Sequence, residues 1–411
     1  GGSVYILELD DINVSSTNTV GATNIFNLTG LNLNDDPIDS TQNILLLGDQ
    51  LEILKSISTT EAITIVTTTP DRTIIIAPDT VNLSAIAGWE NALILTQSEL
   101  DYLSAQKTVY IGNDQLRNTI YLGDGTSTVL RLPEPETVIR AKETKVMTPI
   151  SAEDLTFVGG DGSTTLSADI VQSESLLISD NVVIDGDRTT NSGTTITITG
   201  PVESNGTGEL DNLTLHAGGN ITFESDITLD GDLTITSGDV VTFYGAVTLL
   251  GNLDISGVKK VIFKQAVTVA GIVTVYAADT VTLEADASLK ADGEITIIVD
   301  DNDDDDDLAG AVIDILGDIE SKVKIRIYSG DESAKITITG DVVEAPFVDV
   351  WGGLAADKFI ISQSPADGFM FVQGKGEADD FQISAPNELY APIIIAGDYA
   401  ELLVDEQNNL L

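Results

Sequence analysis

Carboxylates are the residues in this chain whose type and spacing could do chemistry. Asp357, Asp379 and Asp380 end two glycine-rich segments that lie 22 residues apart. A second group, Asp303, Asp305 and Asp307, takes alternate positions in an aspartate run. Calcium prefers oxygen ligands of this kind, so both groups are candidate calcium sites. The run has neither the glycine nor the distal glutamate of an EF-hand loop. The alternative is therefore that the run is an exposed loop and that the other aspartates lie at ordinary corners of the chain.

The sequence offers few residues for catalysis or for metal binding other than calcium. There is no cysteine, and His216 is the single histidine, so thiol catalysis and a histidine metal cluster are excluded. No cofactor other than calcium is predicted. Acid pairs that cleave polysaccharides are one further option, with candidates Asp226, Asp230, Asp232 and Asp254. The threonine-rich surface around them lacks the long loops that build a substrate cleft, so we expect no enzyme. A polysaccharide lyase or hydrolase is the least favoured alternative.

The elements that must position these residues repeat every twenty residues. Apolar residues recur in fixed phases, such as Leu213, Leu233, Leu253 and Val273. Each unit contains short runs in which apolar residues alternate with threonine, which is the period of a strand. A fixed period of this size is typical of a solenoid. The sequence therefore predicts an all-β fold, a parallel β-helix with about 20–22 residues and three short strands per coil.

The repeat divides the chain into four predicted regions. Residues 1–150 form a less regular β-rich region, a possible assembly or capping module, in which residues 96–103 are predicted as a short helix with Thr96 or Ser98 as N-cap. Residues 151–299 form the regular solenoid. Residues 300–307 are an acidic loop, and residues 308–411 continue the solenoid with degenerate Gly/Asp repeats.

Two resemblances add to this interpretation. The segment Leu95–Ser104, followed by Val109–Gly112 and Ile120–Gly123, resembles part of large bacterial exoproteins of the filamentous haemagglutinin type. That resemblance implies a secreted β-helical stalk or adhesin. Gly352–Ile361 and Gly374–Ile383 are similar to degenerate RTX nonapeptide repeats, which implies calcium between coils. These copies lie 22 residues apart instead of nine, and they lack one of the family's glycines.

Composition limits the partners. The chain has 66 acidic and 19 basic residues, a net charge of −47, which disfavours nucleic acids and anionic membranes. No apolar stretch is long enough to span a bilayer, so no membrane insertion is expected. The lack of cysteine favours export, and we expect an extracellular, cell-surface protein of bacterial origin.

The predicted function is structural. We expect a β-solenoid stalk or filament subunit that self-associates end to end by strand addition. It is expected either to form a homopolymer or to be part of a longer chain, of which Gly1 to Leu411 are a segment. The alternative is an adhesin that binds glycans or biofilm matrix. In that case Tyr328, Trp351 and Phe369 should gather on one face.

Overall fold

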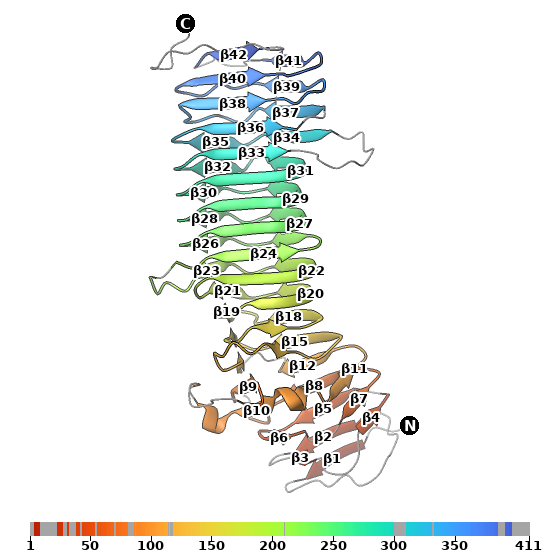
Figure 1. The fold of residues 1–411 in the computed structure, drawn as a ribbon. Coiled ribbons are helices and arrows are strands. Elements are labelled where there is room, and N and C mark those ends of the chain that lie inside the picture. Colours follow the sequence, from red (N-terminus) through yellow and green to blue (C-terminus); the bar gives the residue numbers. More distant parts are fainter. Residues whose placement is uncertain are drawn as a thin grey trace. The chain divides into compact units, whose positions relative to one another are not determined.

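The protein is a parallel β-solenoid. The computed structural model describes residues 4–8, 23–27, 31–32, 38–41, 43–53, 56–69, 71–80, 86, 88–113, 115, 118–208, 210–299, 310–330, 333–384 and 391–396. It is nearly all β, with parallel sheets stacked in about 15 turns, which confirms the predicted fold class (Figure 1). The chain divides into two compact units, Gly1–Ser225 and Asp226–Leu411.

The described residues of the first unit contain the short helix α1 (Gln97–Leu100), the 3-10 turn η2 (Trp89–Asn91) and strands β1 to β25. Its strands are β1 (Val4–Glu8), β2 (Thr23–Asn27), β3 (Leu31–Asn32), β4 (Ile38–Ser40), β5 (Ile44–Leu47), β6 (Leu51–Glu52), β7 (Ile57–Thr59), β8 (Ile63–Val66), β9 (Ile74–Ala77), β10 (Leu93–Thr96), β11 (Leu103–Ala105), β12 (Val109–Gly112), β13 (Thr119–Leu122), β14 (Leu130–Arg131), β15 (Glu136–Arg140), β16 (Glu143–Val146), β17 (Ile150–Ser151), β18 (Asp154–Val158), β19 (Ser163–Leu166), β20 (Ile170–Ile178), β21 (Asn181–Ile184), β22 (Arg188–Ile198), β23 (Val202–Ser204), β24 (Leu213–Ala217) and β25 (Ile221–Phe223).

One coil of the first unit is much longer than the others. Ile63 of β8 pairs with Val109 of β12, and Ile74 of β9 pairs with Ile120 of β13, so each step spans 46 residues. The insertion carries β10 and α1. The helix begins at the predicted N-cap, Thr96, which forms a capping box with Glu99. β9 is buried along its whole length because side chains of the insertion, Trp89 among them, cover its outer face.

The second unit contains the strict repeat. Its strands are β26 (Ile227–Leu229), β27 (Leu233–Phe243), β28 (Val247–Leu249), β29 (Leu253–Phe263), β30 (Val267–Val269), β31 (Val273–Leu283), β32 (Ser288–Ala291), β33 (Ile295–Val299), β34 (Ala311–Ile315), β35 (Asp318–Ser321), β36 (Ile325–Ser329), β37 (Ala334–Ile338), β38 (Phe347–Trp351), β39 (Lys358–Ile361), β40 (Phe369–Gln373), β41 (Asp380–Ile383) and β42 (Ile393–Ala396).

Register in the second unit follows the sequence period. Leu233 pairs with Leu253 and then with Val273, a step of twenty residues. Two of the three predicted strands of each coil here join into one 11-residue strand, as in β27, because the ladder continues through the bend between them. The step from Ile295 to Ile325 is thirty residues, since this coil contains the aspartate run, which lies outside the described residues. Later steps span 22 or 23 residues.

The core of the second unit is a set of apolar columns inside the coils. Phe243 and Phe263 are 1% exposed and stack with ring centroids 5.2 Å apart. Phe359 and Phe381 stack at 4.8 Å in later coils. Each buried side chain of this size contributes about 1.5–3 kcal/mol through removal from water. Phenylalanines one coil apart therefore stabilise the packing of neighbouring coils on each other as well as the interior of each coil.

Candidate functional site

The predicted calcium residues Asp357 and Asp379 lie at one corner of successive coils, just before β39 and β41. The Ala334 N–H donates to Asp357 Oδ1 at 2.7 Å, and the Asp357 N–H donates to Asp379 Oδ1 at 3.0 Å. Each carboxylate thus accepts a backbone hydrogen bond from the preceding coil. A Cβ on Gly352 would lie 2.0 Å from Asp357 Oδ2, and one on Gly374 would lie 1.7 Å from Asp379 Oδ2. The repeated glycine is therefore required by the inward-turned aspartate five residues later.

Asp357 is the more deeply buried of the pair. Its residue is 2% exposed, and its Oδ2 atom has no hydrogen-bond partner. Burial, with a contribution from Asp379, raises the pKa of Asp357 to about 6. Asp380 belongs to the opposite side of the strand, where it is exposed and its Oδ2 lies 3.8 Å from Lys358 Nζ. The structure thus brings together two of the three predicted ligands.

No metal centre with three acidic or histidine ligands is built by the part of the chain that the structure describes. Asp303, Asp305 and Asp307 lie outside the described residues. Calcium at Asp357 and Asp379 would need backbone or water oxygens to complete its shell of six to eight ligands. The calcium site stays a prediction.

A second buried carboxyl, Asp180, occurs in the first unit. It is 2% exposed; Thr164 Oγ1 donates to its Oδ2 at 3.0 Å, and its Oδ1 has no partner. Burial raises the pKa of Asp180 to about 6. A Cβ on Gly159, in the preceding coil, would lie 2.1 Å from Asp180 Oδ2. The sequence reasoning missed Asp180; the signal was the pair of glycines, Gly159 and Gly200, one coil before and after it.

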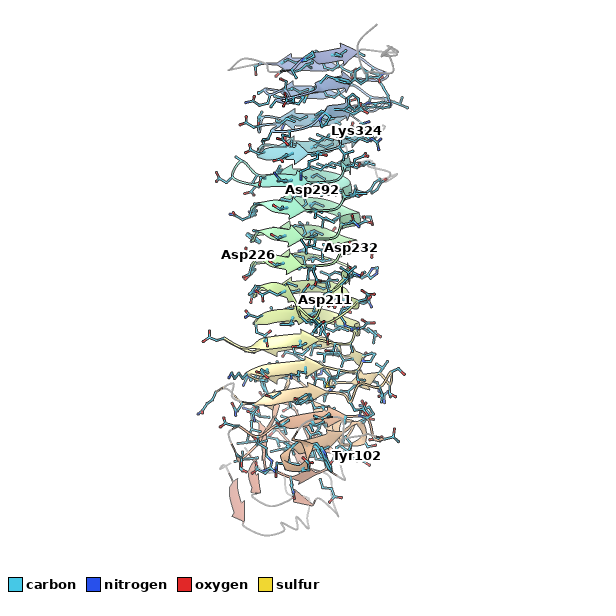
Figure 2. All side chains as sticks on the ribbon, turned by 90° about the vertical axis from the view of Figure 1, so that its left-hand side faces the viewer. Tyr102, Asp211, Asp226, Asp232, Asp292 and Lys324 are labelled. Atoms are coloured by element: carbon cyan, nitrogen blue, oxygen red, sulfur yellow. The ribbon has the colours of Figure 1, made fainter. Side chains whose placement is uncertain are left out.

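Two aspartates of the predicted polysaccharide-cleaving group bind backbone groups instead. Asp226 Oδ1 accepts the Ala246 N–H at 2.8 Å, and Asp232 Oδ1 accepts the Asn252 N–H at 2.6 Å. They lie at opposite ends of β26 (Figure 2). Asp254 lies within β29, on the outer column between Thr234 and Thr274.

Asp230 of the same group and the single histidine, His216, lie at a turn position and a strand position. Asp230 lies in the turn between β26 and β27. His216 is half-buried in β24, where it pairs with Asn191.

Corner carboxylates that accept backbone N–H groups occur in the first unit as well. Asp79 Oδ1 accepts the Ser98 N–H at 2.8 Å, and Asp169 Oδ1 accepts the Thr189 N–H at 2.9 Å. The backbone and side-chain hydrogen bonds from Ser98 lower the pKa of Asp79 below its usual value. Part of the large acidic content of the chain thus satisfies backbone donors where the ladder is broken at a corner.

Ion pairs of the second unit join neighbouring coils. Each links a basic residue to an acid in the coil before or after it, with N···O distances from 2.5 to 3.8 Å. These pairs are Lys259–Asp239, Lys264–Glu284, Lys290–Glu320, Lys322–Asp292, Lys324–Asp349, Arg326–Glu294, Lys335–Asp314 and Lys358–Asp380. The basic residues of this unit thus act along the coil axis, although an exposed pair of this kind contributes only about 0–1 kcal/mol.

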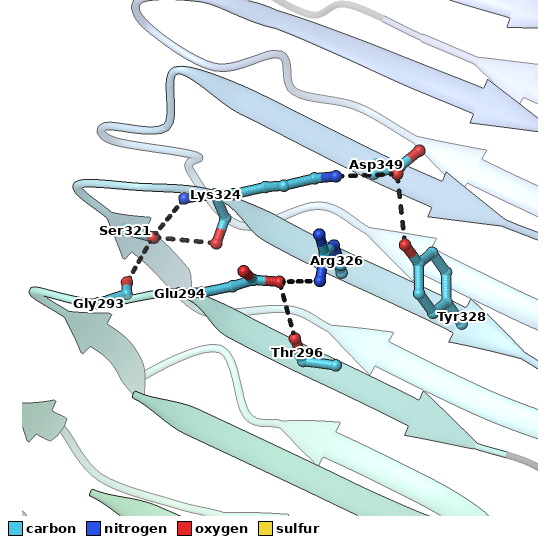
Figure 3. A network of polar contacts seen from close by, with 8 residues as sticks. All are labelled: Gly293, Glu294, Thr296, Ser321, Lys324, Arg326, Tyr328 and Asp349. Atoms are coloured by element: carbon cyan, nitrogen blue, oxygen red, sulfur yellow. Dashed lines mark hydrogen bonds and ion pairs between the residues drawn. The ribbon is translucent and has the colours of Figure 1, made fainter. Parts of the chain in front are cut away.

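Asp349, which is 5% exposed in β38, is a shared partner of three side chains. Its carboxylate lies 3.3 Å from Lys324 Nζ and 3.3 Å from Tyr328 Oη (Figure 3). It also accepts the indole N–H of Trp351. Burial and the Asp349 charge raise the pKa of Tyr328 to about 12. In the coil before, Glu294 Oε1 lies 2.5 Å from Arg326 Nη1 (Figure 3).

The three aromatic residues Tyr328, Trp351 and Phe369 lie on one outer face. Tyr328 pairs with Trp351 across the ladder, and their ring centroids are 5.5 Å apart. Phe347 shares the face of Trp351, four residues along β38, and pairs with Phe369 at 4.7 Å. A pocket of about 160 Å³ lies beside Trp351, lined by Leu354, Gln373, Lys375 and Gly376.

Comparison with known proteins finds no matching family model, no matching curated protein and no matching solved structure. Within the described residues, no helix has the length and apolarity to span a bilayer.

Proposed function

We propose that this chain is a structural β-solenoid, a stalk or filament segment whose role is to span distance and hold its coils in register. The observation that carries the proposal is that polar side chains, like apolar ones, connect one coil to the next. In the second unit the inner columns pack along the axis, corner aspartates accept N–H groups of the neighbouring coil, and ion pairs join adjacent strands. Such nearest-neighbour contacts are how a solenoid gains its stability.

The cellular setting is part of the same proposal. The net charge of −47 and the absence of cysteine support an extracellular, bacterial cell-surface protein. The resemblance of residues 95–123 to filamentous haemagglutinin-type exoproteins supports the same location. End-to-end self-association by strand addition is the finer form of the proposal.

Small-angle scattering and negative-stain microscopy of the full chain test this role. We expect an elongated particle, and filaments or higher oligomers in sedimentation if strand addition occurs. A compact particle would contradict the structural role. An elongated monomer at all concentrations would retain the stalk and remove self-association.

A non-catalytic role is also proposed, and it has its own test. The full chain is incubated with acidic polysaccharides, and new reducing ends or unsaturated products are measured. We expect none above the buffer blank. Product formation that Asp254→Asn abolishes would replace the structural role with the lyase or hydrolase alternative.

Calcium at Asp357 and Asp379 is a second, narrower proposal, favoured by the buried, unpartnered Oδ2 of Asp357. Calcium bound only to the folded state raises the melting temperature. We expect EDTA to lower the melting temperature by several degrees in the wild type and not in Asp357→Asn. An equal melting temperature with and without EDTA would remove the proposal.

A further inference from the structure

The loop between β23 and β24 contains Asn205 followed by Gly206, and no other asparagine of the chain precedes a glycine. In such a pair the backbone nitrogen of the glycine can attack the amide carbon of the asparagine side chain. Asn205 is half-buried, and Gly206 is exposed with φ +70°. Among the described residues, no atom beyond the chain neighbours lies within 4 Å of a Cβ built at Gly206, so water reaches this peptide group.

Two hydrogen bonds fix the Asn205 amide. Its Nδ2 donates to the carboxylate of Asp185, which lies at the same corner of the preceding coil, and its Oδ1 accepts the Thr207 N–H at 2.7 Å. A carboxylate only accepts and an N–H only donates, so these partners define which end of the amide is the oxygen. The ring that the Thr207 bond closes contains both Asn205 Cγ and Gly206 N. The side chain is therefore folded back over the nitrogen that would attack it.

Neighbouring carboxylates hold this arrangement in place. Asp211 is 0% exposed; its Oδ2 accepts the Asn205 N–H at 2.9 Å, and its Oδ1 accepts the Gly186 N–H at 2.6 Å. Asp185 Oδ2 accepts from Ser167 Oγ at 2.6 Å. The backbone and the amide of Asn205 are thus both tied to neighbouring parts of the corner. Reacting groups that are held together in this way need no search through the conformations of a flexible loop.

The contacts also suit the charge that the reaction creates. When Gly206 N bonds to Asn205 Cγ, negative charge develops on Oδ1, where the Thr207 N–H already donates. Gly206 N gives its proton to solvent, the Cγ–Nδ2 bond breaks, and Nδ2 leaves as ammonia after it takes a proton from solvent. Water then opens the cyclic imide at either of its two carbonyl carbons, which gives aspartate or isoaspartate.

We propose that Asn205 is a self-modification site, which the folded chain converts to aspartate and isoaspartate through an imide with Gly206. Water is the co-reactant and ammonia the product. The conversion replaces a donor to Asp185 with a second carboxylate, so a hydrogen bond between coils becomes a contact of like charges. The proposal is separate from the structural role, because the coils form before the amide reacts.

Mass spectrometry of the full chain tests the proposal. The folded protein is kept in mildly alkaline buffer, sampled over time and cleaved after glutamate, and the mass change from amide to carboxyl is followed. Residues 204–209 then form a peptide with Asn205 as its single asparagine. We expect conversion at least about threefold faster in the folded chain than in urea, because unfolding releases the fixed amide and the Thr207 donor. Fragmentation of the peptide separates isoaspartate from aspartate.

Asn252 is an internal control in the same sample. Its Nδ2 also donates to a corner aspartate, at 3.1 Å from Asp232 Oδ1, but its Oδ1 accepts the Ile272 N–H of the following coil at 2.9 Å. The residue after it is Leu253, the first residue of β29. Asn252 is the single asparagine of the peptide of residues 225–284, and it should keep its amide.

Three variants locate the cause. Gly206→Ala should slow the conversion at least about tenfold, because a positive φ disfavours alanine and its Cβ crowds the attacking nitrogen. Asp185→Ala should slow it to the rate in urea, since the amide loses its fixed orientation. Asp232→Ala removes the matching bond from Asn252 and should leave the rate at Asn205 unchanged.

Several outcomes would overturn the proposal. These are a rate in the folded chain at or below the rate in urea, equal conversion of Asn205 and Asn252, or equal rates in Asp185→Ala and Asp232→Ala. A wild-type rate in Gly206→Ala with an unchanged melting temperature would also overturn it, because the imide requires attack by that nitrogen.

Discussion

Two stretches of the second unit share one interior and differ in their exterior. In the strict coils, β26 to β31, the outer column reads Thr234, Asp254 and Thr274. In the later coils the same column reads Arg326, Asp349 and Phe371. The inner positions stay apolar in both stretches, and they are buried as far as β40. Solenoid geometry thus constrains the inner face, whereas the outer face is free to acquire charge networks, aromatic rings and a pocket.

Truncation of a core side chain is expected to cause the largest loss in the free energy of unfolding. The loss should be the same in both stretches. Phe263→Ala and Phe359→Ala each remove a buried ring that stacks on a ring of a neighbouring coil. Each should lower the free energy of unfolding by about 3–5 kcal/mol, measured by urea denaturation. If one loss in free energy is under half of the other, the two stretches do not share an equivalent interior.

The pH dependence of stability should separate the stretches. Because the pKa of Asp357 is raised to about 6, the folded protein holds this proton more tightly than the unfolded chain does. The carboxyl therefore contributes stability that is complete below a pH of about 4 and is lost as the pH rises through about 6, up to about 3 kcal/mol for two pKa units.

Denaturation across that pH range checks this prediction. Relative to the wild type, Asp357→Asn should gain stability as the pH rises from about 4 to 7. Asp254→Asn in the strict coils, where the carboxylate is exposed, is the control and should parallel the wild type. Parallel curves for wild type and Asp357→Asn would show that the buried carboxyl is not protonated in this range.

Loss of the buried network should cost less than a core ring. Asp349→Ala leaves Lys324, Tyr328 and the Trp351 indole without their common acceptor. We expect a loss of about 1–3 kcal/mol in the free energy of unfolding. Stability equal to the wild type would mean that water replaces the carboxylate, and that this face is as tolerant as the threonine columns.

The smallest effect is expected for an exposed pair of the strict coils. Lys259 and Asp239 lie 3.1 Å apart, with side chains 62% and 48% exposed. Lys259→Gln should change the free energy of unfolding by less than about 0.5 kcal/mol, and less again at high salt. A loss comparable to that of Asp349→Ala would remove the distinction between the two exteriors.

Much of the fold was predictable because its signals are local and repeated. Apolar residues at alternating positions and at steps of twenty predicted parallel coils, and the structure pairs Leu233 with Leu253 as that period requires. The N-cap candidates Thr96 and Ser98 and the acidic first turn predicted a helix over residues 96–103, and the structure has the shorter α1, capped by Thr96. The glycines before Asp357 and Asp379 were noticed and interpreted as calcium turns. The structure shows that these glycines make room for the carboxylates of buried Asp357 and half-buried Asp379, and the calcium interpretation stays a prediction.

The candidate pocket was harder to predict because it depends on register after the aspartate run. The sequence named Tyr328, Trp351 and Phe369, but it did not show that Lys375 lies over Trp351 or that Asp349 accepts its indole N–H. The Asp349 contact lies within β38, whereas Lys375 and Trp351 lie on different coils, and the step between coils changes from thirty to 22 or 23 residues. One residue of slip would reverse which side chains face outward.

The sequence by itself determined the solenoid, its coil length and its apolar columns, because burial repeats with the period of the chain. Only the tertiary structure decided the roles of the charged residues. An exposed aspartate that accepts a backbone N–H, one that pairs with a lysine and one that is buried with one oxygen unpartnered have the same side chain. What distinguishes Asp226, Asp380 and Asp357 is the atom that the neighbouring coil places beside each carboxylate.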